Sequence, residues 1–325
     1  MNPRPPILAG LLACALVASG CGGDDGEEPA SQPPPPASAG QFPSAKGKTL
    51  LELYEELPSG GPVLAPSTSQ FVVGDNRFGF GLFTPGRDQI ADAAAAVYVA
   101  RAGGGEARGP FVARAESLEV DTQFRSQSSA ADPDAAKFVY VTELPFDKPG
   151  KYEILGMARR DGRLVAATSA LPQLTVRKDD LVPAPGERAP VIHTPTEADV
   201  GGDLEQIDTR VPPSTQHDSD FADVVRERPI VLTFATPRLC QSRVCGPVVD
   251  VAEQVKAEYE DQAEFIHMEV FVDNDVQKGY RPQLAAWNLP TEPWAFTVDA
   301  DGRVVARLEG AFSPRELEAA VEKAL

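Results

Sequence analysis

The C-terminal part of the chain alternates between short apolar runs and stretches with helical spacing. The run from Pro229 to Phe234 is typical of a buried strand, and apolar residues between Pro247 and Glu260 recur on one helical face. The other predicted elements are a strand over 263–271, a short helix over 280–287, strands over 294–298 and 303–306, and a terminal helix that opens at Ser313-Pro314. The predicted order is therefore β-α-β-α-β-β-α, with the first two strands parallel because a helix connects them.

From about Thr49 to Arg177 the pattern changes to short apolar runs cut by Gly, Pro and Asp. These runs lie at 71–73, 78–83, 95–99, 138–141, 152–155 and 164–167. Regular turn signals between such runs predict an all-β sandwich over residues 46–178. The segment from Pro149 to Glu153 resembles the strand-opening turn of exported immunoglobulin-like modules, so we expect an immunoglobulin-like sandwich without catalytic residues. The aromatic residues expected in its core are Phe78, Phe80 and Phe83.

The chain begins with the pattern of an export signal. Arg4 precedes an apolar run that ends in Ala18-Ser19-Gly20-Cys21, and this ending resembles a bacterial lipobox. Residues 1–21 are therefore predicted to be a lipoprotein signal peptide, with Cys21 as the lipidated first residue of the mature protein. An ordinary signal peptide is the alternative. Acyl chains on Cys21 would bind a lipid bilayer, so the predicted location is the extracytoplasmic side of the cell membrane, where disulfides persist.

Two connecting segments lack the composition of a packed core. Residues 22–45 contain an acidic run and four consecutive prolines, which favour extended backbone and predict a disordered Pro-rich tether. Residues 179–226 are rich in Pro and Asp and are predicted to be an extended linker. His193 and His217 lie in this linker among polar neighbours, where an isolated histidine is usually solvated, so we assign them no role.

Composition narrows the possible functions. Lys+Arg total 30 and Asp+Glu total 48, so the formal charge is 30 − 48 = −18. This charge works against nucleic acid or an anionic membrane surface as the main partner, because phosphates would be repelled. The length of 325 residues suggests two domains, and 42% apolar residues are enough to form their cores. No apolar run reaches the roughly 18–20 residues that a membrane-spanning helix needs.

Cysteine usage points to one pair. Of four cysteines, Cys14 lies in the predicted signal and Cys21 is the predicted lipid site, so Cys240 and Cys245 remain. A disulfide closing so short a loop would stabilise the fold little, because loop-closure entropy grows with loop length. A redox or metal role therefore explains the pair better than a local structural disulfide.

Residues 227–325 resemble the thioredoxin fold in element order and in three local motifs. Phe234-Ala235-Thr236 ends the first core strand, as a similar triplet does before the active site of that family. Cys245-Gly246-Pro247 matches the first three residues of the family's Cys-Gly-Pro-Cys, and Glu292-Pro293-Trp294 matches its cis-proline segment. The resemblance implies a thioredoxin-like domain in which Gly246 and Pro247 begin a helix and Pro293 and Trp294 line a substrate groove.

The pair departs from the family motif, because Val248 occupies the position of its second cysteine. Residues five apart on a continuous helix have Cα atoms about 8 Å apart, beyond the roughly 7 Å that a disulfide spans, so Cys240 must precede the helix. Cys245 would then lie at the helix N-terminus, where the helix dipole lowers a thiol pKa, and Arg243 is a candidate for added positive potential. We therefore expect Cys245 to attack and Cys240 to resolve, although the sequence also allows the reverse.

The predicted function is a membrane-anchored thiol-disulfide oxidoreductase without cofactor or metal. Its expected partners are exported protein thiols or a membrane redox partner. Three alternatives remain open. The segment from Ser242 to Cys245 is similar to the Thr-x-Val-Cys of peroxiredoxin-like peroxidases, although Pro237 stands one residue too far from Cys245 for their motif. A Sco-type copper protein would need two cysteines three apart and a distal histidine, whereas His267 lies in a predicted strand. The third alternative is a non-catalytic binding or scaffold lipoprotein with a structural disulfide.

Overall fold

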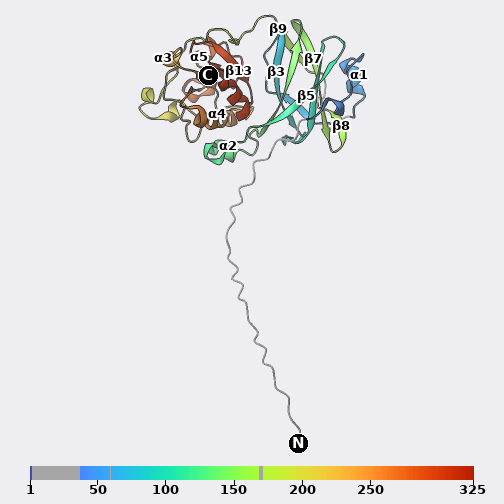
Figure 1. The fold of residues 1–325 in the computed structure, drawn as a ribbon, viewed down its shortest axis with the longest axis horizontal. Helices are drawn as coiled ribbons and strands as arrows, with labels where there is room; N and C mark the ends of the chain where they lie inside the picture. Colours follow the sequence, from blue (N-terminus) through green and yellow to red (C-terminus); the bar gives the residue numbers. More distant parts are fainter. Residues whose placement is uncertain (2–36, 59, 168–170) are drawn as a thin grey trace. The chain divides into compact units, whose positions relative to one another are not determined.

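The computed structural model describes residue 1 and residues 37–58, 60–167 and 171–325. The predicted signal peptide, Cys21 and the tether up to residue 36 lie outside these residues. Among the helices of the described residues, none is long and apolar enough to cross a bilayer. The part of the chain from residue 37 onwards holds a β-rich domain and an α/β domain (Figure 1).

The end of the predicted tether is part of the β-rich domain. Phe42 and Ala45 are buried in the same apolar cluster as Tyr98 and Leu155. Helix α1 (Leu50–Glu55) follows, capped by the Thr49 side chain, which accepts from the Glu52 backbone N–H. The predicted end of the tether at residue 45 is therefore too late.

The β-rich domain is built from nine strands and one short helix between two of them. The strands are β1 (Val63–Pro66), β2 (Phe71–Val72), β3 (Gly74–Phe83), β4 (Ala94–Arg101), β5 (Arg108–Ser117), β6 (Phe138–Phe146), β7 (Gly150–Arg160), β8 (Arg163–Ala166) and β9 (Gln173–Arg177), and α2 (Gln127–Ala131) lies between β5 and β6. They pair in the order β1-β3-β6-β5-β4-β7-β9-β2, with β8 beside β7. The predicted strand content is thus confirmed.

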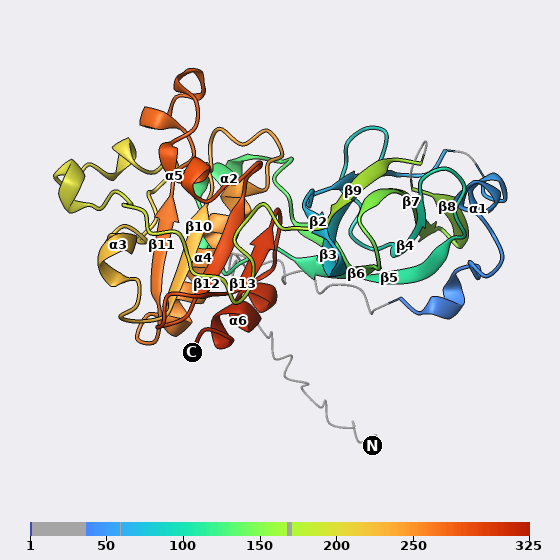
Figure 2. The ribbon, with the colours of Figure 1, turned by 90° about the horizontal axis from the view of Figure 1, so that it is seen from above.

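This sheet curls around its core. Only Val73 separates β2 from β3, although these strands lie near opposite ends of the pairing order. The ends of the sheet must therefore approach each other, as Figure 2 shows. Phe78 and Phe80 stack inside the curl and confirm the predicted core, whereas Phe83 is partly exposed. The immunoglobulin-like sandwich is not confirmed, because the strands form one continuous sheet rather than two stacked ones.

The α/β domain contains the predicted order of elements. They are β10 (Ile230–Phe234), α4 (Cys245–Tyr259), β11 (Glu264–Met268), α5 (Pro282–Ala286), β12 (Trp294–Val298), β13 (Val304–Glu309) and α6 (Pro314–Glu322), preceded by α3 (Phe221–Val224). The sheet order is β11-β10-β12-β13, with β10 parallel to β11 and antiparallel to β12. The Ser313 side chain caps α6 in a capping box with Glu316, as the sequence predicts.

Both faces of this sheet are covered, which explains why β10 is apolar throughout. Ile230 and Leu232 belong to the core cluster that includes α3 and α5 residues. Val231 belongs to the opposite cluster, which α4 and α6 cover. Because successive strand residues point to opposite faces, a strand buried on both sides requires a continuous apolar run.

The segment predicted to be an extended linker packs against the α/β domain. Val182, Ile192 and Phe221 are buried in the same core cluster as Leu232. Further along the segment, the His267 backbone N–H donates to the Gln216 carbonyl at 3.0 Å. Residues 179–226 have few regular elements, but part of their apolar side chains is buried against the domain, whereas Leu181, Val191 and Val211 remain exposed.

Polar contacts join the β-rich domain to the α/β domain. Arg77 of β3 forms a bidentate ion pair with Glu316 of α6, at 2.9 and 2.8 Å. The same guanidinium donates to the carbonyls of Glu309 and Ala311. Near α2, the Ser126 hydroxyl donates to Asp250 of α4 at 3.1 Å. The loop before α4 also contacts the β-rich domain, because the Ala136 backbone N–H donates to the Arg243 carbonyl at 3.2 Å.

Candidate functional site

The loop between β10 and α4 carries both candidate cysteines. Cys240 lies in this loop, and α4 begins at Cys245, so the placement that a local disulfide requires is met. Both residues are free thiols. Their sulfurs and a carboxylate oxygen of Glu292 lie within 4.8 Å of one another. The structure thus brings the predicted pair together and adds a carboxyl group to it.

Cys240 is partly exposed and is surrounded by donors. A hydrogen bond from the Cys245 thiol is the main cause that lowers the pKa of Cys240 to about 6, against the opposing effect of burial. The Ser242 hydroxyl, 3.1 Å from the sulfur, and the backbone N–H groups of Cys245 and Val244 also lower it. These N–H groups are unpaired within α4 because they begin the helix, so Cys240 occupies the position at which a helix N-terminus stabilises a thiolate.

Cys245 has the opposite environment. It is 0% exposed. Burial raises its pKa well above the usual value, and the hydrogen bond to Cys240 and the negative charges of Cys240 and Glu292 act in the same direction. The backbone N–H of Thr236 opposes them. The sequence predicted a lowered pKa at Cys245. That prediction is wrong, because a residue at the first helical position is buried here and its own N–H points to the other cysteine.

Glu292 lies directly before the predicted cis-proline, and the Glu292–Pro293 bond is cis. The Cys245 sulfur lies 3.9 Å from Glu292 Oε2, close enough for a hydrogen bond to sulfur. Burial raises the pKa of Glu292 to about 8, with further contributions from the charges of Cys240 and Glu269. A carboxyl group with such a pKa can exchange a proton with a neighbouring thiol near neutral pH.

Trp294 belongs to the core and not to a groove. It is 1% exposed and stacks on Phe296, with ring centroids 5.6 Å apart. Its indole N–H donates to the Thr291 hydroxyl at 3.2 Å. Pro293 is also buried. The side chain of Trp294 therefore does not line a substrate groove as predicted. It is packed in the core cluster that α3 and α5 cover.

Helix α4 begins at Cys245, so Gly246 and Pro247 are its second and third residues. Both are buried. A side chain at Gly246 would place its Cβ 2.9 Å from the Ser129 hydroxyl oxygen. Ser129 lies on α2 of the β-rich domain, which packs against this helix start. Glycine at this position is therefore explained by the close approach of α2.

A cavity of about 360 Å³ opens beside Cys240. Ser128 and Asp132 contribute to one wall, and Pro237 and Arg238 contribute to the other. Arg243 also lines it, but its guanidinium is ion-paired with Asp132 and with Asp134, the latter at 3.2 Å. The positive charge of Arg243 is therefore paired with carboxylates of the β-rich domain. The same domain supplies part of the surface from which a substrate would reach Cys240.

Sequence reasoning missed Glu292 as a site residue and missed a buried polar cluster below the cysteine loop. The cluster contains Asp208, His217 and His267, which are 2%, 3% and 1% exposed. His217 was expected to be solvated, and this expectation is wrong because the segment that carries it packs on the domain. His193, by contrast, is exposed and binds Asp220 at 2.6 Å. The position of Glu292 directly before the predicted cis-proline could have indicated a site residue. No local sequence pattern predicts that Asp208 and His267 lie together, because they are far apart in the chain.

Two groups of side chains have the composition of a metal site. Cys240, Cys245 and Glu292 offer two sulfurs and one oxygen, a set suited to a soft or borderline metal. Asp208, His217 and His267 offer one oxygen and two ring nitrogens. The low pKa of Cys240 and the carboxyl group beside Cys245, which can exchange a proton with that thiol, suit thiol chemistry at the first group.

Comparisons with family models and with curated proteins find no match. Among solved structures, one similar chain is described as the thiol:disulfide interchange protein DsbE from Chlorobium tepidum, at 14% identity and TM-score 0.31, over 44% of this chain and 98% of that one. A second is a thioredoxin-family thiol:disulfide interchange protein from Chlorobium tepidum TLS, at 17% identity and TM-score 0.30, over 43% and 99%. A third is the Lin-41 filamin domain, at 9% identity and TM-score 0.21, over 38% and 100%. All three TM-scores are below 0.5, so these likenesses assign no function to the cysteine site.

Proposed function

We propose that this protein is a thioredoxin-like thiol-disulfide oxidoreductase whose reactive pair is Cys240 and Cys245. The observation that carries the proposal is the difference between the two thiols in exposure and pKa. Cys240 is partly exposed beside a cavity and has a pKa lowered to about 6, whereas Cys245 is buried and has a raised pKa. This asymmetry reverses the roles expected from the sequence and makes Cys240 the attacking thiolate.

In the first step, the Cys240 thiolate attacks one sulfur of a substrate disulfide. A bond forms between Cys240 and that sulfur, and the other substrate sulfur leaves as a thiolate. The hydrogen bonds of Ser242 and the N-terminal N–H groups of α4 keep Cys240 ionised before attack. Only a thiolate is nucleophilic enough for this step.

In the second step, Cys245 resolves the mixed disulfide. Its proton passes to Glu292, the new thiolate attacks Cys240, and the remaining substrate sulfur leaves. The balance is a two-electron reduction of the substrate disulfide and formation of the Cys240–Cys245 disulfide. The reverse sequence oxidises a substrate dithiol, so the same residues serve either direction.

The proposed setting is the extracytoplasmic side of the cell membrane. An acylated Cys21 would anchor the chain to the lipid bilayer, and the partners would be exported protein thiols or a membrane redox partner. The β-rich domain would restrict access to Cys240, since α2 contributes one wall of the neighbouring cavity. A peroxidase fits less well, because the cysteine in its motif would be Cys245, which is buried.

Alkylation of the reduced protein tests the assignment of the two thiols. We expect iodoacetamide to modify Cys240 first, at a rate that rises through about pH 6 and then levels, because the rate follows the thiolate fraction. Cys245 should react only after denaturation, as it is 0% exposed. Peptide mass mapping after brief labelling measures both. Preferential labelling of Cys245 in the folded protein would reject the assignment.

A further inference from the structure

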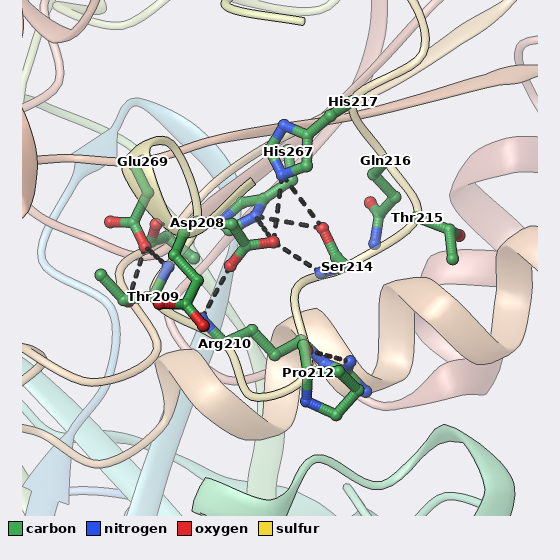
Figure 3. Close-up of polar contacts among 12 residues, drawn as sticks. Asp208, Thr209, Arg210, Pro212, Ser214, Thr215, Gln216, His217, His267 and Glu269 are labelled. Carbon is green, nitrogen blue, oxygen red and sulfur yellow. Dashed lines mark hydrogen bonds and ion pairs between the residues drawn. The ribbon is translucent and has the colours of Figure 1, made fainter. Parts of the chain in front are cut away.

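A buried hydrogen-bonded cluster lies beneath the loop that carries the cysteines. Figure 3 shows the Asp208 carboxylate and Ser214 facing the rings of His217 and His267. Asp208 Oδ2 lies 3.0 Å from His217 Nε2 and 3.2 Å from His267 Nδ1. The Ser214 backbone N–H donates to the same oxygen at 2.7 Å. The carboxylate is thus surrounded by donors in a site closed to water.

The contacts of His267 define its protonation. Its Nε2 lies 3.1 Å from the Ala235 carbonyl oxygen, which can only accept, so Nε2 carries a proton. Its Nδ1 faces the Asp208 carboxylate, which also accepts, so a second proton belongs there. Burial opposes the charged ring, but the Asp208 charge and hydrogen bond raise the pKa of His267 to about 9. His267 is therefore an imidazolium at neutral pH.

One peptide group connects this imidazolium to the cysteine pair. The carbonyl that accepts from His267 belongs to Ala235, and the N–H of the same peptide group belongs to Thr236. A hydrogen bond from that N–H lowers the pKa of the Cys245 thiol. A cation at the oxygen end of a peptide group withdraws electron density and makes its N–H a stronger donor. The effect reaches Cys240 as well, because its sulfur lies within 4.8 Å of the Cys245 sulfur and a hydrogen bond with Cys245 lowers the pKa of Cys240.

The arrangement fits a proton-bearing cluster better than a metal site. If His217 bound a metal through Nε2, its proton would sit on Nδ1, and Nδ1 has no hydrogen-bond partner among the described residues. A ligating histidine nearly always donates its second ring N–H to an acceptor. If the proton of His217 is on Nε2 and points to Asp208, Nδ1 is an acceptor without a partner among the described residues. Burying an unpaired acceptor costs less free energy than burying an unpaired N–H.

We propose that His267 is a positioning residue for the redox pair, which acts through the Ala235–Thr236 peptide group to stabilise the singly ionised dithiol. This inference rests on the proposed function, since it concerns how the same pair is tuned. Asp208 holds the imidazolium in place, and His217 shares the carboxylate without touching the peptide group. The charged or titratable groups that face this cluster from its neighbours are Arg210 and Asp250, paired at 2.9 Å, Glu253 of α4 and Glu269 after β11.

The test compares three variants of the full chain. Asp208→Asn and His267→Gln both remove the cation, and His217→Gln keeps it as a matched control from the same cluster. We expect the first two to raise the apparent thiol pKa and to shift the equilibrium with glutathione about tenfold toward the protein disulfide, the equivalent of one pKa unit. For a two-electron couple this is about 30 mV toward a more reducing potential. His217→Gln should stay within about twofold of the wild type.

A measurement on the unmodified protein guards against variants that fail to fold. Nitrogen NMR of the histidine rings should show both nitrogens of His267 protonated at pH 7. A neutral His267 ring, stoichiometric metal in the purified protein, or folded Asp208→Asn and His267→Gln variants with unchanged thiol pKa and potential would each overturn the inference. If instead the wild-type pair fails to exchange but its potential still responds to these variants, the proposed function fails and the link from His267 stands.

Discussion

The Cys245→Ser variant is expected to accumulate a covalent mixed disulfide at Cys240, whereas Cys240→Ser is expected to lose exchange entirely. In the first variant the attacking thiolate remains, but no second thiol can release the bound substrate. In the second, the remaining thiol is buried and protonated, so disulfide reduction should fall to the rate measured without protein. Turnover of a model disulfide and non-reducing mass spectrometry measure the two outcomes.

The double variant Cys240→Ser/Cys245→Ser provides the baseline, and Ser242→Ala separates the role of the neighbouring hydroxyl. Ser242→Ala should keep turnover and raise the pKa of Cys240, because one hydrogen bond to the thiolate is lost. A mixed disulfide trapped at Cys245 in the Cys240→Ser variant would restore the roles expected from the sequence. Full turnover in both single variants would reject the cysteine pair as the reactive site.

Replacing Glu292 by glutamine is expected to slow resolution of the mixed disulfide by about 10²–10⁴-fold, the usual contribution of a positioned proton acceptor. Glu292 is the carboxyl group within reach of the Cys245 sulfur, at 3.9 Å. Because the pKa of Glu292 is raised to about 8, the carboxyl group is protonated below that pH and cannot accept. In the mixed disulfide Cys240 carries no charge, so one of the causes that raise the pKa of Glu292 is absent while burial remains. The resolution rate should therefore rise with pH through a value below about 8 in the wild type.

Single-turnover release of a fluorescent thiol from a preformed mixed disulfide at Cys240 measures this step. Glu258→Gln is the matched control, since it changes an exposed carboxyl group on α4 and should leave the rate unchanged. In Glu292→Gln this inflection should disappear. An unchanged rate and pH profile in this variant would mean that Cys245 loses its proton directly to water.

The secondary structure of the α/β domain could be predicted from the sequence because each element has a local signature. The continuous apolar run of β10 reflects a strand covered on both faces, and the Ser313-Pro314 start of α6 is a capping pattern that needs no tertiary context. The β-rich domain was predicted as strands for the same reason. Its curl was not, because it depends on β2 pairing with β9, a contact between distant segments.

The chemistry of the site depends on burial that the sequence does not display. The spacing of Cys240 and Cys245 indicates the pair, and it places Cys240 before the helix because a disulfide cannot span five residues of a continuous helix. The sequence predicted the lowered pKa at Cys245, whereas the lowered pKa belongs to Cys240, since helix α4 begins at Cys245 and directs its N–H groups at Cys240. The segment around His217 was interpreted as a solvated linker because its composition is polar, although it fills a gap beside β11.

The reduction potential of the Cys240–Cys245 pair tests the central claim most directly. It is measured by thiol labelling of the purified protein across a series of glutathione ratios. We expect a midpoint between about −120 and −270 mV, the range of catalytic thiol-disulfide exchangers. A midpoint below about −300 mV would contradict it, because such a disulfide resists the glutathione pool and serves structure, as in a non-catalytic binding protein.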